Sequence, residues 1–176
     1  KQNKIDKALS IVSSPRFNKN SIAQQLLKAT AQQKAKQLVS DGKSKEAKAF
    51  IDELIAKQNN DDIDLKLLLA NIYYASDQEP LGLEIINELK TSHSTSALPY
   101  EFMANQLFAK KDFEAAIDEY SQAWDIKPSA LLAIRMSQTL KQLESNEAFK
   151  PLLDWLEIEP DSPRVMTMLA MSYQEN

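Results

Sequence analysis

The sequence has no cysteine and only two glycines among its 176 residues. Without cysteine the chain can form neither disulfides nor thiolate metal sites. Folds built from strands and tight turns need glycine where the backbone φ is positive, so its scarcity favours helices joined by short connections. No apolar run approaches the roughly 20 residues of a membrane span. We therefore expect a helical chain that does not itself insert into a membrane.

Positive charge is also scarce relative to negative charge. The chain carries 21 lysines and arginines against 25 aspartates and glutamates, a formal net charge of −4. It therefore lacks the basic field that attracts nucleic acid or anionic membranes, and we expect neither as a partner. No signal peptide precedes Lys1, and the first residue is not methionine. We expect a processed segment of a longer protein, from which any targeting signal has been removed.

Residues that could carry out chemistry are few. His93 is the one histidine, and the polar run TSHSTS around it predicts a solvated ring with no buried neighbour to tune it. Asp61, Asp62 and Asp64 are spaced like the start of a calcium loop, but its bend glycine and terminal glutamate are missing, so a turn and helix cap fits better. No nucleophile–base pair, phosphate loop or ligand cluster is visible. The sequence predicts a protein that is not an enzyme and has no cofactor or metal.

The clearest structural pattern is the run YEFMANQLFAKKDFEAAIDEYSQAWDIKP, residues 100–128. It predicts two amphipathic helices joined by a tight turn. Asp112 is placed to cap the second helix, and Pro128 to end it. The apolar positions of the first helix recur at three- and four-residue steps, at Tyr100, Met103, Ala104, Leu107 and Phe108.

The same unit recurs along the chain. A small residue stands in each first helix at steps of 35, 34, 33 and 33 residues, at Ala35, Ala70, Ala104, Ser137 and Ala170. A second small row stands in the second helices at steps of 35, 34 and 32 residues, at Ala47, Gly82, Ala116 and Ala148. A bulky residue follows each of these after four positions, at Ile51, Ile86, Tyr120 and Leu152. Helices approach closely only where a side chain is small, and the bulky residue one turn on fills the space beside it.

This pattern resembles the tetratricopeptide (TPR) repeat, a helix–turn–helix unit of about 34 residues. The resemblance implies an all-α fold, a right-handed TPR-like superhelix of antiparallel helix pairs (an α-solenoid) in a single array over residues 1–176. The predicted parts are an N-terminal helix and linker at 1–20 with the helix at 5–12, repeats at 21–60, 61–96, 97–128 and 129–160, and the first helix of a truncated repeat at 161–176.

Two second helices carry specific local expectations. In the repeat at 61–96, Leu83, Ile86 and Leu89 are predicted to form the buried face. In the repeat at 129–160, Pro151 lies about one turn inside the second helix, so it should kink that helix or delay its start.

In TPR arrays the first helices line a concave face, so the resemblance implies that inner-face residues recur in each repeat. The positions one and four residues after the small residue give the pairs Asn71 and Tyr74, Asn105 and Phe108, and Gln138 and Lys141. Asparagine offers a donor and an acceptor to a peptide backbone, and a flat ring offers contact area. The first two pairs, Asn71 with Tyr74 and Asn105 with Phe108, match each other and resemble the asparagine ladder of peptide-binding TPR domains.

We take these six residues, with Glu101, as candidate peptide-binding residues. Some TPR domains clamp a terminal carboxylate with lysine or arginine four residues before the asparagine. Leu67 and Glu101 stand there instead, so we expect no such clamp. The alternative for the two aromatic residues is that their rings pack against the neighbouring repeat.

The run PSALLAIRMSQTLKQLESNEAFKPLLDWLEIEPDSPRVMTMLAMSY, residues 128–173, carries a second resemblance. It is similar to the repeats of bacterial TPR lipoproteins associated with exosortase/PEP-CTERM protein sorting. The shared cadence consists of Leu152, Trp155, Leu156, Pro160, Ser162, Arg164, Leu169 and Ala170. This resemblance implies a lipoprotein segment on the periplasmic side of the cell envelope, which acts as an assembly scaffold for exported surface proteins or polysaccharide.

The leading hypothesis is thus a non-catalytic scaffold that binds proteins or peptides in its concave groove, in envelope export or surface-structure biogenesis. The alternatives are a cytoplasmic TPR adaptor or regulator, and a regulatory helical module of a larger enzyme. The last helix is too apolar for a polar capping helix. We expect it to expose an apolar strip, covered by later repeats or by a homodimer contact, that consists of Met166, Leu169, Met171 and Tyr173.

Overall fold

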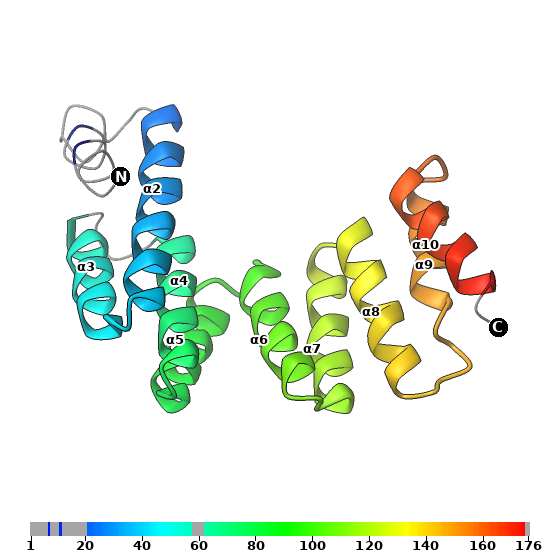
Figure 1. Cartoon of the computed structure of the whole chain (residues 1–176). Helices are drawn as coiled ribbons and strands as arrows, with labels where there is room; N and C mark the ends of the chain where they lie inside the picture. Colours follow the sequence, from blue (N-terminus) through cyan, green and yellow to red (C-terminus); the bar gives the residue numbers. More distant parts are fainter. Residues whose placement is uncertain (1–6, 8–10, 12–20, 58–61, 175–176) are drawn as a thin grey trace. The chain divides into compact units, whose positions relative to one another are not determined.

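The computed structural model describes residues 7, 11, 21–57 and 62–174. All regular secondary structure in these residues is helical, and no strand occurs among them (Figure 1). This confirms the all-α class that the scarcity of glycine predicts. The expected helix at residues 5–12 falls almost entirely outside the described residues, as does Asp61. No helix in the described ranges combines the length and apolarity that crossing a bilayer requires.

The chain divides into two compact units, Lys1–Glu88 and Leu89–Asn176, and each is described by itself. Unit 1 contains α2 (Ser21–Ser40), α3 (Ser44–Lys57), α4 (Ile63–Ala75) and most of α5 (Glu79–Ser92). Helix α2 packs against α3 and α4, and α3 packs against α4. Lys66 of α4 binds Glu88 of α5 at 2.7 Å, so α5 follows α4 as the next member of the unit.

The small residues predicted to lie at helix crossings are buried in unit 1. Ala35, Ala47 and Ala70 are fully buried, as is the bulky Ile51 one turn after Ala47. Gly82 on α5 is the tightest of these contacts, since a Cβ there would lie 2.7 Å from two ring carbons of Tyr74 on α4. Any larger residue at position 82 would therefore displace the tyrosine ring.

Helix α5 differs from the sequence prediction in one position. Ile86 and Leu89 are fully buried as expected, but Leu83 is 40% exposed. Gly82 is the residue that lies against α4, and its neighbour Leu83 is rotated about 100° from it around the helix. The prediction for Leu83 was wrong because the contact with α4 is centred on a glycine rather than on an apolar side chain.

The polar residues before α4 act as a cap. Asp62 accepts hydrogen bonds from the backbone nitrogens of Asp64 and Leu65, at 3.1 and 3.3 Å. Lys28 of α2 forms ion pairs with Asp62 at 3.0 Å and with Asp64 at 2.8 Å. Both carboxylates therefore serve the start of α4, as the turn-and-cap interpretation predicts.

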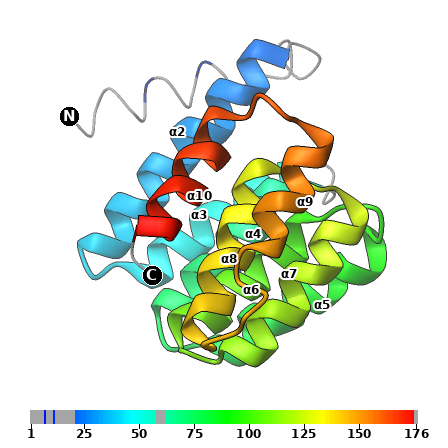
Figure 2. The same cartoon turned by 90° about the vertical axis from the view of Figure 1, so that its right-hand side faces the viewer.

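Unit 2 contains α6 (Leu98–Ala109), α7 (Phe113–Ile126), α8 (Ala130–Gln142), α9 (Lys150–Ile158) and α10 (Pro163–Gln174). Each of the first four packs against the next, and α10 packs against both α8 and α9 (Figure 2). Asp112 caps α7 and Ser129 caps α8, by accepting from the backbone nitrogens of Ala115 and Leu132. Pro151 lies in the first turn of α9, so it delays the start of that helix and does not kink it.

Two clusters form the core of unit 2. The first surrounds Ala104 and Ala116 and includes Tyr120, Ala123 and Leu132. The second joins α8, α9 and α10 through Ala133, Ile134, Leu152 and Val165. The small and bulky rows of the sequence therefore lie at buried positions of the helices, with two exceptions. Ala148 is buried but lies in the turn before α9, and Ala170 is exposed on α10.

The last turn of α5 belongs to unit 2. The ammonium of Lys90 binds both carboxylate oxygens of Glu119 on α7, at 2.5 and 2.6 Å. The two side chains are only 19% and 17% exposed, and the ammonium lies 4.7 Å from the ring centre of Tyr100 on α6. This group attaches the end of α5 to α6 and α7.

Candidate functional site

The two predicted polar–aromatic pairs lie in different units. In unit 1, Asn71 is exposed on α4, while the Tyr74 ring is half-buried against the backbone of Gly82. Part of the Tyr74 ring therefore packs on α5 of its own predicted repeat, residues 61–96, whereas the alternative interpretation placed it against the neighbouring repeat. The exposed part of the Tyr74 side chain and the exposed Asn71 lie three residues apart on α4.

In unit 2, Asn105 on α6 is held by a neighbour that the sequence did not indicate. The hydroxyl of Tyr120 on α7 donates a hydrogen bond to Asn105 Oδ1 at 2.7 Å. Tyr120 is 1% exposed, and burial raises the pKa of its phenol, so the hydroxyl keeps its proton and acts as the donor. Asn105 is exposed, and its oxygen has a second lone pair, so its amide N–H groups and that oxygen can still serve a partner as donor and acceptor.

Phe108 and Glu101 are both half-buried on α6. The Phe108 ring meets Phe113 edge to face, with ring centres 5.3 Å apart, and packs against the first cluster. Burial raises the pKa of Glu101, while the charge of Lys127 acts in the opposite direction. The charge of Arg135 on α8 acts to lower the pKa of Tyr120, and the charge of Glu101 acts to raise it. The structure thus gathers Glu101, Asn105, Tyr120 and Arg135 into one polar group.

The last predicted pair lies on α8. Gln138 and Lys141 are both half-buried. The Lys141 ammonium lies 5.8 Å from the ring centre of Phe149, the residue before α9. Lys141 is therefore turned toward the connection between α8 and α9.

A shallow, largely open groove of about 480 Å³ lies between α8 and α10. It is lined by Ile134, Pro163, Arg164, Thr167, Met168 and Met171. The floor is apolar, Arg164 supplies a cation, and Met171 is more than half exposed. This combination is suited to an apolar side chain of a partner with a polar or acidic group beside it.

Exposed apolar residues also occupy an equivalent position on the other first helices of unit 2. Leu98 and Leu131 stand six residues before the small residues Ala104 and Ser137, and both are exposed. Arg164 stands six residues before Ala170. This set could have been predicted from the sequence, because each member stands six residues before the small residue of its helix.

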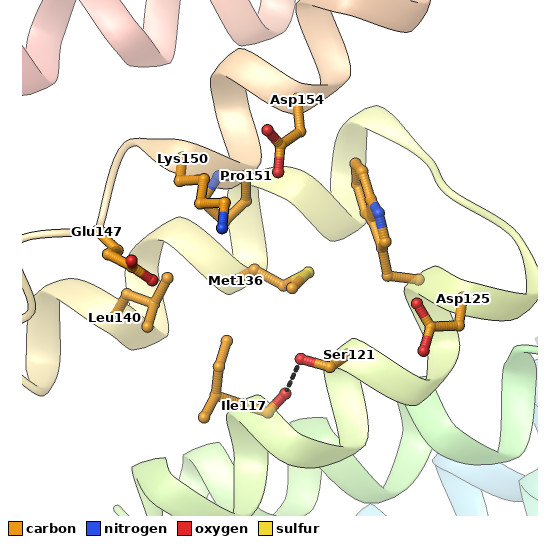
Figure 3. A pocket seen from close by; sticks show the side chains of 10 residues that line it. Ile117, Ser121, Asp125, Met136, Leu140, Glu147, Lys150, Pro151 and Asp154 are labelled. Carbon is orange, nitrogen blue, oxygen red and sulfur yellow. Dashed lines mark hydrogen bonds between the residues drawn. The ribbon is translucent and has the colours of Figure 1, made fainter.

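A second cavity, of about 280 Å³, lies between α7, α8 and α9. Apolar side chains of Ile117, Met136 and Leu140 line it, and Figure 3 shows Asp125, Glu147, Lys150 and Asp154 around them. The remaining lining residues are Ser121, Trp124 and Pro151. This cavity could not be predicted from the sequence, because its lining residues come from three helices and the connection before α9 and share no spacing.

Residues suited to metal chemistry do not gather in the described ranges. No group of three or more histidine, cysteine, aspartate or glutamate side chains there could hold a metal ion. His93 follows α5, with Nδ1 2.9 Å from Ser92 Oγ.

Comparison with known proteins bears on the fold. No protein-family model matches the sequence, and no curated protein matches it. Two solved structures of MamA are similar, each at 16% sequence identity. A mutant form matches with a TM-score of 0.50 over 86% of this chain and 89% of its own, and MamA of AMB-1 with 0.51 over 92% and 93%. MamA is a TPR-repeat protein, and the likeness shows that this chain has an all-α, TPR-like fold.

Proposed function

We propose that this protein is a non-catalytic scaffold that binds segments of other proteins along the first helices of its TPR-like fold. The observation that carries this proposal is the groove between α8 and α10, with its apolar floor and Arg164 beside it. Arginine is one of the side chains that contribute most to binding at protein interfaces, and the exposed apolar side chain of Met171 beside it adds contact area. The likeness to a TPR protein supports the same class of function.

The rest of unit 2 offers a continuation of this surface. Leu98 and Leu131 supply apolar contacts on α6 and α8, and the amide of Asn105 supplies donors for a peptide carbonyl. We propose that a partner segment contacts these helices as well, and that Gln138 and Lys141 contribute polar contacts from α8. Asn71 and Tyr74 are proposed to serve the same purpose in unit 1.

The first prediction concerns contact at the groove. A photo-crosslinking amino acid at Met171, in the full-length protein in its source cell, should give discrete crosslinked protein bands, because Met171 lines the groove and is 55% exposed. The matched control is Ile158, which is 58% exposed at the end of α9 and outside the groove. Arg164→Ala should weaken the Met171 bands. Identical bands from both positions, or none from Met171, would contradict the proposal.

We propose the cell envelope as the setting, on the basis of the resemblance at residues 128–173. A cytoplasmic adaptor and a regulatory module of a larger enzyme are the alternative settings for the same groove. Fractionation of cells that express the full-length protein separates the first two settings. Recovery in the envelope fraction supports export or surface-structure biogenesis, whereas recovery in the cytoplasm supports the adaptor.

We also propose a homodimer contact through α10. Met166 and Tyr173 are 51% and 60% exposed, and they lie with Ala170 on one side of the helix. Met171 lies on the groove side instead, and Leu169 packs against the second cluster of unit 2. The expected strip is therefore narrower than we predicted from the sequence. Exposed apolar patches of this kind promote association.

A second prediction follows for this face. Sedimentation of the wild type should show self-association that rises with concentration, and Met166→Lys/Tyr173→Lys should reduce it. Leu153→Lys, a change of an exposed leucine on α9, is the control and should leave association unchanged. A wild type that stays monomeric at high concentration would remove the proposal.

A further inference from the structure

We propose that the cavity between α7, α8 and α9 is a second binding site, which takes a lysine or arginine side chain of a partner protein. It is separate from the groove between α8 and α10. Met136 lines the cavity and Ile134 lines the groove, and residues two positions apart lie about 200° apart around a helix. The two sites therefore occupy opposite sides of α8.

The interior of the cavity suits the stem of a basic side chain. Its apolar lining comes from Ile117, Trp124, Met136, Leu140 and Pro151. Lysine and arginine carry a long apolar stem, which packs on apolar surface while the charged end stays near water or a counter-ion. A volume of about 280 Å³ has room for a single such side chain rather than for a folded element.

The rim supplies the complementary charge. Three carboxylates, those of Asp125, Glu147 and Asp154, stand around the opening against the one cation of Lys150 (Figure 3). None of these four side chains forms an ion pair with another described residue. The rim therefore has an excess of two negative charges that the described residues of unit 2 do not neutralise. An incoming cation would meet carboxylates on several sides.

Two of the rim charges oppose the dipoles of their own helices. Asp125 stands in the last turn of α7, where the carbonyl end of the helix disfavours an anion. Lys150 is the first residue of α9, where the amide end disfavours a cation. Neither charge stabilises the helix that carries it, although both line the same cavity. Local conflicts of this kind are expected where residues serve a binding site.

The Trp124 wall is held in place before any partner arrives. Trp124 meets Trp155 edge to face, with ring centres 6.3 Å apart. The indole nitrogen of Trp155 donates to Glu159 and to Ser162 Oγ, both at 3.1 Å, which fixes that ring in turn. Tryptophan is the aromatic side chain that attracts cations most strongly, so this wall favours the same ligand as the rim.

The test uses the two tryptophans as reporters, since the sequence contains no others. The full chain is titrated with the capped peptide Gly-Leu-Arg-Leu-Gly, and Trp emission is followed. We expect a saturable change with this peptide and at least about five-fold weaker binding of the peptides with glutamine or glutamate in place of arginine. Equal binding of all three peptides, or no saturable change at millimolar peptide, would overturn the proposal.

Variants of the rim should act in opposite directions. Asp125→Asn/Asp154→Asn removes two counter-charges at nearly constant shape and should weaken binding of the arginine peptide about five-fold. Lys150→Gln removes the competing cation and should strengthen it about two-fold. Weaker binding by Lys150→Gln, or no effect of the double change, would refute the charge argument.

A groove variant separates this inference from the proposed function. Arg164→Ala/Met171→Ala changes two α10 side chains of the groove, which lies on the other side of α8 from the cavity, and should leave the peptide titration unchanged. If that variant abolishes binding, the peptide occupies the groove and the cavity proposal fails while the scaffold proposal stands. Far-UV circular dichroism of each variant verifies that the helices remain folded.

Discussion

Replacing Leu152 by alanine is expected to lower the free energy of unfolding of unit 2 by about 2–5 kcal/mol. Leu152 is fully buried on α9, in the cluster that joins α8, α9 and α10. Removing its isobutyl group loses apolar burial and leaves a cavity beside Ala133 and Val165, which α9 can close only by moving. Because this one small cluster joins α8, α9 and α10, we expect the substitution to destabilise all three helices.

Urea unfolding followed by tryptophan fluorescence measures this effect, since Trp124 and Trp155 both belong to unit 2. The matched control is Leu153→Ala, which removes the same group from the neighbouring position, where the side chain is 46% exposed. That control should change stability by less than about 0.5 kcal/mol. If both variants shift the transition equally, the assignment of Leu152 to the core is wrong.

Enlarging Ala104 to leucine is the second large effect, with an expected loss of about 1–3 kcal/mol. Ala104 is fully buried on α6, where the first cluster of unit 2 brings it together with Ala116 and Tyr120. A leucine there has no space unless the two helices separate, and such a separation would also disturb the Tyr120–Asn105 hydrogen bond. Alanine and leucine have similar helix propensities, so the effect reports packing rather than helix formation.

Thermal unfolding by circular dichroism, with the same change at Ala109 as the control, measures this loss. Ala109 is exposed at the end of the same helix, so Ala109→Leu should unfold near the wild-type temperature. If Ala104→Leu also unfolds at the wild-type temperature, the small row of the repeat is misaligned at this position.

The fold could be predicted from the sequence because its rules are local. A small residue such as Ala104 or Ala116 is required wherever two helices cross closely, and both are fully buried. Asp112 caps α7 because a short acceptor is needed before the first free backbone N–H groups. Leu83 could not be placed correctly, because the repeat pattern alone does not reveal that Gly82 makes the contact between α5 and α4.

The candidate site was less predictable, because it depends on side-chain partners from different helices. Asn105 was found by its position in the repeat, but its bond to Tyr120 joins residues 15 apart and depends on how both side chains point. The cavity between α7, α8 and α9 depends on the three-dimensional approach of Asp125 and Asp154, which follow no common period. For Asn71 and Tyr74, a role in binding remains a prediction.

The end of α5 governs how the protein can be divided for expression. A fragment that starts at Leu98 would lack Lys90, and would leave the poorly exposed carboxylate of Glu119 without its counter-ion. A fragment that stops at Ser76 would lack Gly82, and would uncover the ring of Tyr74. Since one continuous helix serves both units, each recombinant half needs its own copy of α5. Overlapping fragments of residues 21–92 and 79–174 satisfy both requirements.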